Sequence, residues 1–227
     1  MSLFEIIALS VTASILILYN LLVVSFSRGA FSRSLHSLVL ASTAAFIRKH
    51  LSSSDPSADL LAVQSLRNTA LVAIFIGGIA FQAFQTAATA AAEAASPVAA
   101  SRNLILASFL LCSFLNFALV IRAASHLSFM IGAAPVVPHV VARADVGGGE
   151  VGPEAAFSLR FNVLCLSLME AMSLHFSLGF RCLYASVPFT YASSGPTALC
   201  ISGGVMLAFL FYSDFGTHAD ARDLRRR

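Results

Sequence analysis

One stretch decides the fold of this chain: residues 103–126 read NLILASFLLCSFLNFALVIRAASH. Arg122 is the only charged residue in it. An α-helix rises about 1.5 Å per residue and the hydrocarbon core of a bilayer is about 30 Å thick, so roughly 20 apolar residues suffice to cross it. The stretch therefore predicts a transmembrane helix.

The composition of the whole chain points the same way. Of the 227 residues, 58% are hydrophobic and 11% are charged. A soluble domain carries about 25% charged residues, so this chain has too few charges to cover a surface that faces water. The formal net charge of +3 is also too small, and too scattered along the chain, for a nucleic-acid partner. The protein belongs in a membrane.

Working outward from residues 103–126, four further stretches have the length and composition of a membrane span. We expect an all-α fold, a polytopic bundle forming a single transmembrane domain over residues 1–215. Its five spans are predicted at about 3–26, 69–94, 103–126, 174–192 and 197–213. An arrangement with four crossings and a re-entrant last hairpin stays open. The first span lacks a basic leader and a small-residue cleavage site, so it is expected to be retained.

Between the spans, the sequence predicts one or two amphipathic helices that lie in the membrane interface. The first is residues 31–49, where apolar residues recur at helical spacing among basic ones. The second is residues 157–173, since 157–192 is too long for one straight span. Residues 135–154 hold three prolines and three consecutive glycines and predict a flexible loop. Residues 193–196, Ser-Ser-Gly-Pro, predict a tight turn, and residues 216–227 form a basic tail.

Basic residues set the expected orientation, because cytoplasmic loops are enriched in Lys and Arg. With five spans, Arg102 lies alone on one face and Arg181 lies within a span. The opposite face receives Arg28, Arg33, Arg48, Lys49, Arg67, Arg122, Arg143, Arg160, Arg222, Arg225, Arg226 and Arg227. We therefore expect the C-terminus on the cytoplasmic or matrix side and the N-terminus opposite. Mitochondrial inner membrane, endomembrane and plasma membrane all remain open.

The charged residues at or within the spans are the candidate site. Such residues are costly in a bilayer and are usually paired or face a cavity. In one interpretation, Arg181 forms an intramembrane ion pair with Asp214 or Glu170, and Arg67 and Arg122 reach toward lipid headgroups. In the other, Arg67, Arg122 and Arg181 converge on an anion, most simply a phospholipid headgroup.

Other chemistry finds little support in the sequence. His126 and His175 are weak candidates for haem ligands, since no third ligand has a definable spacing. The four cysteines show no metal-ligand spacing. A GxSxG motif and paired aspartates within spans are both absent from the sequence. We expect no metal, no cofactor and no catalytic residues, and hence a protein that is not an enzyme.

Three groups of residues resemble a known family. They are Leu61-Ala62-Val63-Gln64-Ser65-Leu66-Arg67-Asn68; Ser113-Phe114 with Ile121-Arg122; and Gly179-x-Arg181-x-x-Tyr184-x-x-x-Pro188 with Gly195-Pro196 and Asp214-Phe215. Together they resemble the multi-pass membrane proteins of plants and bacteria called domain of unknown function 599, from the first span to Phe215. One departure is the lack of Trp, because family members carry one shortly before the Gly-Pro turn, where this chain has Ala192. The family has no established activity, so the resemblance implies the architecture alone.

Two functions of different classes follow as expectations. The first is a non-catalytic accessory or structural subunit that packs within a larger membrane protein complex and binds lipid at its interface. It is suggested by the small residues of the spans, which let helix backbones approach closely, and by the sparse polarity within the spans. The second is a small oligomeric transporter or channel for an anionic solute, which would use the arginines to attract its substrate.

Overall fold

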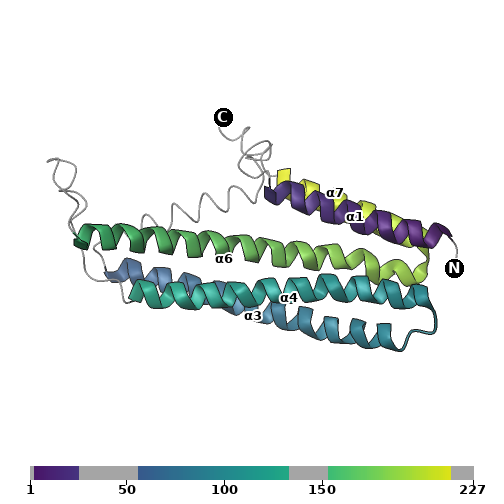
Figure 1. Cartoon of the computed structure of the whole chain (residues 1–227), viewed down its shortest axis with the longest axis horizontal. Coiled ribbons are helices and arrows are strands. Elements are labelled where there is room, and N and C mark those ends of the chain that lie inside the picture. The colour runs from purple at the N-terminus through teal and green to yellow at the C-terminus, as the bar shows by residue number, and fades with distance from the viewer. Residues whose placement is uncertain (1–2, 26–55, 133–152, 216–227) are drawn as a thin grey trace.

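The computed structural model describes residues 3–25, 56–132 and 153–215 (Figure 1). Within these ranges the chain is helical, with short turns and no strands. The elements are α1 (Leu3–Ser25), α3 (Pro56–Ala92), α4 (Pro97–Gly132), α6 (Pro153–Tyr191), the 3-10 helix η1 (Ala192–Ser194) and α7 (Pro196–Phe215). Five of these helices are long and apolar enough to cross a membrane. The predicted all-α, five-span architecture is confirmed.

Proline marks where the described helices begin. Four of the five long helices have proline as their first residue: Pro56, Pro97, Pro153 and Pro196. The first turn of a helix has backbone N–H groups without partners, so proline costs nothing there and its fixed φ already suits the helix. Before α4, the Ser96 hydroxyl also accepts a hydrogen bond from the Ala99 N–H at 3.2 Å. These local signals place the turns of the bundle.

The predicted tight turn between the last two spans is present. After α6, residues 192–194 form η1, and the Gly195 N–H donates to the Ala192 carbonyl at 3.2 Å. Gly195 has φ = 109°, a conformation that side chains with a Cβ disfavour, and Pro196 then starts α7. Glycine and proline together therefore reverse the chain in a few residues.

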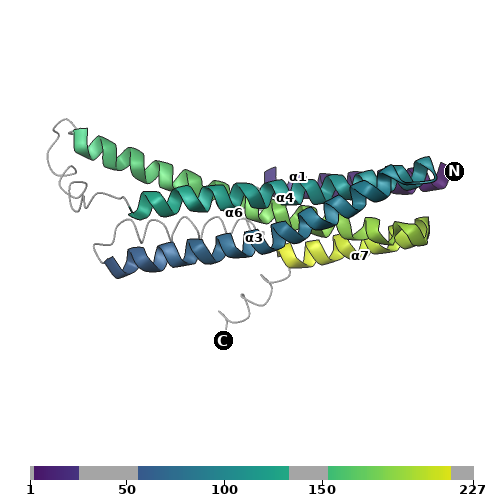
Figure 2. The same cartoon turned by 90° about the horizontal axis from the view of Figure 1, so that it is seen from below.

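Three helices are much longer than the other two. At about 1.5 Å per residue, α3, α4 and α6 are each roughly 55 Å long, whereas α1 and α7 match the hydrocarbon thickness of about 30 Å. Both short helices lie along the same end of α6 (Figures 1 and 2). We call the part of α3, α4 and α6 that continues past the ends of α1 and α7 the three-helix extension.

The long helices correct two predicted boundaries. The expected division into an interfacial helix at 157–173 and a span at 174–192 is wrong, because α6 is one helix of 39 residues. The second span, predicted to begin at about residue 69, is likewise part of a longer helix, because α3 begins at Pro56. The prediction assumed that a helix ends where the bilayer ends, but packing of the three long helices against one another extends them further. Residues 31–49 and 216–227, and most of 135–154, lie outside the described residues.

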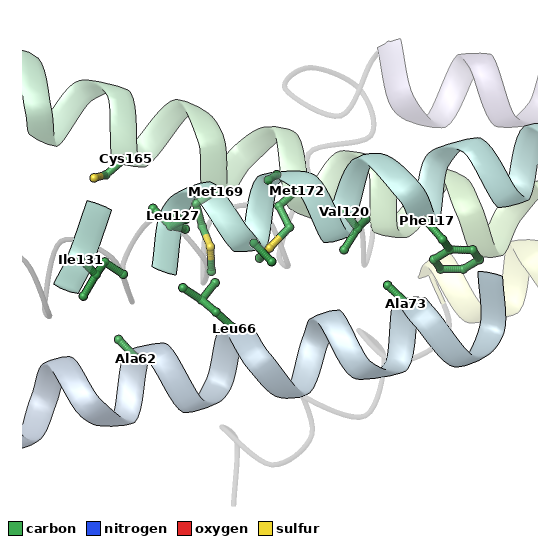
Figure 3. Packing of buried hydrophobic residues seen from close by; sticks show 12 residues of the cluster. Ala62, Leu66, Ala73, Phe117, Val120, Leu127, Ile131, Cys165, Met169 and Met172 are labelled. Carbon is green, nitrogen blue, oxygen red and sulfur yellow. The ribbon is translucent and has the colours of Figure 1, made fainter. Parts of the chain in front are cut away.

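The main core of the three long helices is an apolar cluster between α3, α4 and α6 (Figure 3). Its buried members are Ala62, Leu66, Ala73, Phe117, Val120, Ala123, Ala124, Leu127, Ile131, Cys165, Met169 and Met172. Phe117 is fully buried between the three helices. A Cβ atom on Gly77 would lie 3.1 Å from the Phe117 Cβ, and one on Gly179 would lie 2.9 Å from its Cζ. The two glycines thus leave the space that the phenyl ring fills.

A second apolar cluster attaches α1 and α7 to the bundle. It contains Leu16 of α1, Phe189 of α6 and Leu210 of α7, all with 3% exposure or less. At the crossing of α1 and α7, a Cβ on Gly203 would lie 2.8 Å from the Thr12 Cγ2, while the neighbouring Gly204 faces open space. Only the first glycine of the Gly203-Gly204 pair therefore permits a close crossing.

The five-span fold predicts that the two ends of the chain lie on opposite faces of the membrane. A membrane-impermeant thiol reagent should label single cysteines at positions 2 and 220, in a Cys-free background, from opposite sides of sealed vesicles. Cysteines at positions 95 and 194, in the turns before α4 and α7, serve as controls and should be labelled from the same side as position 2. Labelling of positions 2 and 220 from one side would contradict five crossings.

Candidate functional site

A buried ion pair joins α6 to α7. Arg181 Nη2 donates to Asp214 Oδ1, and the two residues are only 6% and 3% exposed. The second carboxylate oxygen, Oδ2, accepts a hydrogen bond from the Tyr19 hydroxyl of α1 at 2.7 Å. Both oxygens of Asp214 therefore have partners, and three helices meet at one carboxylate.

The rest of the Arg181 guanidinium is also engaged. Its Nη1 donates to Asn20 Oδ1 at 3.2 Å, and its Nε donates to the Ser177 hydroxyl at 3.3 Å. Asn20 in turn donates to the Leu16 carbonyl at 2.8 Å. Arginine has donors on three nitrogens, and here each of them finds an acceptor.

We call Tyr19, Asn20, Ser177, Arg181 and Asp214 the polar cluster. It lies close to where α1 and α7 end and the three-helix extension begins, since Asp214 is the residue before the last of α7. Burying a charge without a partner costs several kcal/mol, and the opposite charge with further hydrogen bonds offsets that cost. The arrangement can hold the α1 and α7 pair against α6, and the partners of its two charged side chains all lie within the cluster.

Of the two predicted partners of Arg181, the structure pairs it with Asp214. Glu170 lies eleven residues earlier on α6, about 16 Å along the helix axis, so its side chain belongs to a different level of the bundle. The other members of the polar cluster were not predicted from the sequence: Tyr19, Asn20 and Ser177. An arginine within a span implies acceptors at the same depth on neighbouring spans, and polar residues near the end of the first span were the available signal.

Arg67 and Arg122 have a different environment from Arg181. Both are exposed, on α3 and α4 respectively, whereas Arg181 is buried between α1, α6 and α7. The structure therefore brings Arg181 and Asp214 together and leaves Arg67 and Arg122 on the outside of the bundle. A role of the arginines in binding an anion or a lipid stays a prediction.

The two candidate histidines do not face each other. His175 Nδ1 lies 2.9 Å from Asn116 Oδ1, so the His175 ring meets an amide group of α4. His126 is exposed on α4, ten residues beyond Asn116 and hence about 15 Å further along the helix axis. Over residues 3–25, 56–132 and 153–215, the structure holds no group of three His, Cys, Asp or Glu that could bind a metal ion.

One further polar contact links α4 and α6. The buried Ser113 hydroxyl donates to the Gly179 carbonyl at 2.8 Å, next to the Phe117 ring. Ser113, Gly179, Arg181 and Asp214 are among the residues on which the family resemblance depends. Those residues thus coincide with the contacts that hold α4, α6 and α7 together.

The comparison with known protein families agrees with that resemblance. No curated protein and no solved structure matches this chain. Residues 7–219, nearly the whole chain, match the family described as "Protein of unknown function, DUF599". The chain is therefore a member of the DUF599 family of membrane proteins.

Proposed function

We propose that this protein is a non-catalytic accessory or structural subunit, which packs within a larger membrane protein complex and binds lipid at its interface. The observation that carries the proposal is the apolar surface of the three-helix extension. There Phe129, Leu60 and Val163 are 78%, 62% and 61% exposed. Gly77 and Gly179 both pack on Phe117, and Gly179 is two residues from Arg181, whose partner Asp214 lies at the end of α7. Leu60 lies seventeen residues before Gly77, about 25 Å further along α3, and therefore past the ends of α1 and α7.

A bilayer alone does not account for this surface. If the hydrocarbon layer covers α1 and α7, the five-helix part spans its thickness of about 30 Å, and the three-helix extension lies beyond it. Large exposed apolar side chains beyond that layer call for a protein partner, because contiguous apolar patches in water are rare on monomeric proteins. An accessory subunit would bury the extension against its neighbours in the complex.

The polar cluster supports the same proposal. Its charged groups are directed at one another and are engaged in holding helices together, which is a structural use of an intramembrane arginine. Lipid binding then falls to Arg67 and Arg122, whose exposed guanidiniums can grip phosphate with two parallel hydrogen bonds. Because Arg181 is paired with Asp214, we leave it out of this lipid site.

The native mass of the protein tests the proposal. In mild detergent extracts of its own membrane, the chain should migrate in an assembly several times its own mass, with other subunits in fixed proportion. The Phe129→Ser, Val163→Ser double variant should release it from that assembly, because both side chains lie on the extension. The control is Ile201→Ser, Val205→Ser, which changes equally exposed residues of α7 within the five-helix part and should leave the assembly intact.

Two results would overturn the proposal. One is a small homo-oligomer in the extract that neither double variant changes. The other is saturable anion flux by the purified protein alone in proteoliposomes, which would favour the transporter. Both experiments use the full chain.

A further inference from the structure

A hollow lies at the end of the bundle remote from the three-helix extension. It has a volume of about 370 Å³ and is lined by the first two turns of α1 and α4, the first turn of α7 and the turns that precede α4 and α7. Leu9, Val98 and Leu199 form its apolar lining, and Ser96 and Ser193 add hydroxyl groups. The polar cluster and the exposed arginines Arg67 and Arg122 lie elsewhere, so the hollow is not part of the site described above.

Two opposite charges line this hollow. Glu5 comes from the first turn of α1, and Arg102 comes from the second turn of α4. Arg102 Nε donates to Asn103 Oδ1 at 3.3 Å, and the two Nη groups carry the remaining four N–H donors of the guanidinium. A guanidinium favours phosphate and a carboxylate favours an ammonium group, so the pair suits a ligand that carries both charges.

The position of the hollow across the membrane limits the class of ligand that it can bind. The apolar spans of α1, α4 and α7 begin at Phe4, Pro97 and Pro196, so the hollow lies where the hydrocarbon layer ends and the headgroup layer begins. An apolar wall beside charged groups matches a molecule that has a zwitterionic headgroup and apolar acyl chains. Free soluble zwitterions share the headgroup chemistry and lack the apolar part.

We propose that this hollow binds a zwitterionic phosphoryl headgroup, with the phosphate on Arg102 and a primary ammonium group near Glu5. Phosphatidylethanolamine has this chemistry. The ammonium group donates hydrogen bonds to a carboxylate, which the quaternary ammonium of phosphatidylcholine cannot do. The site goes beyond the proposed function, because it lies at the opposite end of the bundle from Arg67 and Arg122 and does not require a protein partner.

Native mass spectrometry of the full chain tests the site. The protein in dodecyl maltoside micelles is titrated with dioctanoyl phosphatidylethanolamine, and with the choline and glycerol analogues. We expect one ethanolamine lipid bound per chain, more tightly than either analogue. Arg102→Gln should weaken binding by about tenfold or more, since a charge-assisted pair of hydrogen bonds is lost. Glu5→Gln should remove the preference for ethanolamine lipid over the anionic glycerol analogue.

Matched variants separate the site from general effects of charge. Glu93→Gln changes an exposed carboxylate near the same end of the bundle that does not line the hollow, so it should bind as the wild type does. Ser193→Trp should block binding by filling the hollow while it keeps both charges. Thermal melting of each variant verifies that it is folded.

The outcomes are distinct. Equal affinity of the wild type for the ethanolamine and glycerol lipids, or undiminished binding by Arg102→Gln, would overturn the site. Competition by free phosphoethanolamine identifies the source of the ligand: displacement of the lipid at similar concentration points to a soluble zwitterion, and failure to displace it points to a membrane lipid. The assembly test in the previous section does not depend on either result.

Discussion

Arg181→Ala is expected to lower the free energy of unfolding in detergent by about 3–5 kcal/mol, because it leaves a buried carboxylate without its cation. Asp214 is 3% exposed and has Tyr19 as its other partner, and a neutral hydroxyl cannot balance its charge. The measurement is thermal or denaturant unfolding of the purified protein, followed by circular dichroism.

Two further variants separate charge from size. Arg160→Ala removes an exposed arginine from the same helix, and its cost should stay below about 1 kcal/mol, as for other exposed charges. The double variant Arg181→Leu, Asp214→Leu removes both charges and should recover much of the lost stability, because replacing a whole buried ion pair with apolar residues is often neutral. If Arg181→Ala and Arg160→Ala unfold alike, the ion pair does not hold α7 to α6.

Phe117→Ala is expected to destabilise the protein by about 3–5 kcal/mol, because the ring fills the contact between α3, α4 and α6 and its loss leaves a cavity. Its ring also meets those of Phe176 and Phe180 edge-on, with centroids 6.0 Å and 5.2 Å away. These two contacts add to the area that is lost. Unfolding in detergent, measured as above, gives the size of the effect.

Gly179, one of the two glycines beside the Phe117 ring, provides an independent test of this contact. Gly179→Ala should cost about 1–3 kcal/mol, since the new Cβ would lie 2.9 Å from the Phe117 Cζ. In the Phe117→Ala background the same change should cost little, because the ring is gone. Gly78→Ala is the control: it faces open space in the same helix as Gly77 and should be neutral or stabilising by about 0.5–1 kcal/mol. Equal effects of Gly179→Ala in both backgrounds would show that the ring does not press on α6.

Local properties of the sequence, namely apolar stretches and the positions of proline and glycine, were enough to predict much of this fold. Long apolar stretches require a bilayer, and each proline or Gly-Pro pair limits where a helix can begin, whatever lies around it. The turn at residues 193–196 and the partnership of Arg181 with one of two carboxylates followed in the same way. The helix and turn predictions depend on composition and on residues close in the sequence, and the ion-pair prediction depends on the cost of an unpaired charge within a span.

Only the tertiary structure decided how the helices meet. It made α6 continuous through Ser173 and Leu174, selected Gly77 and Gly203 over the glycines beside them, and supplied Tyr19 and Asn20 as partners in the polar cluster. In a membrane protein, the side chains that face lipid and those that face other helices are both apolar. The sequence pattern therefore leaves the rotation and axial offset of each helix undetermined, and packing contacts such as the one around Phe117 decide them.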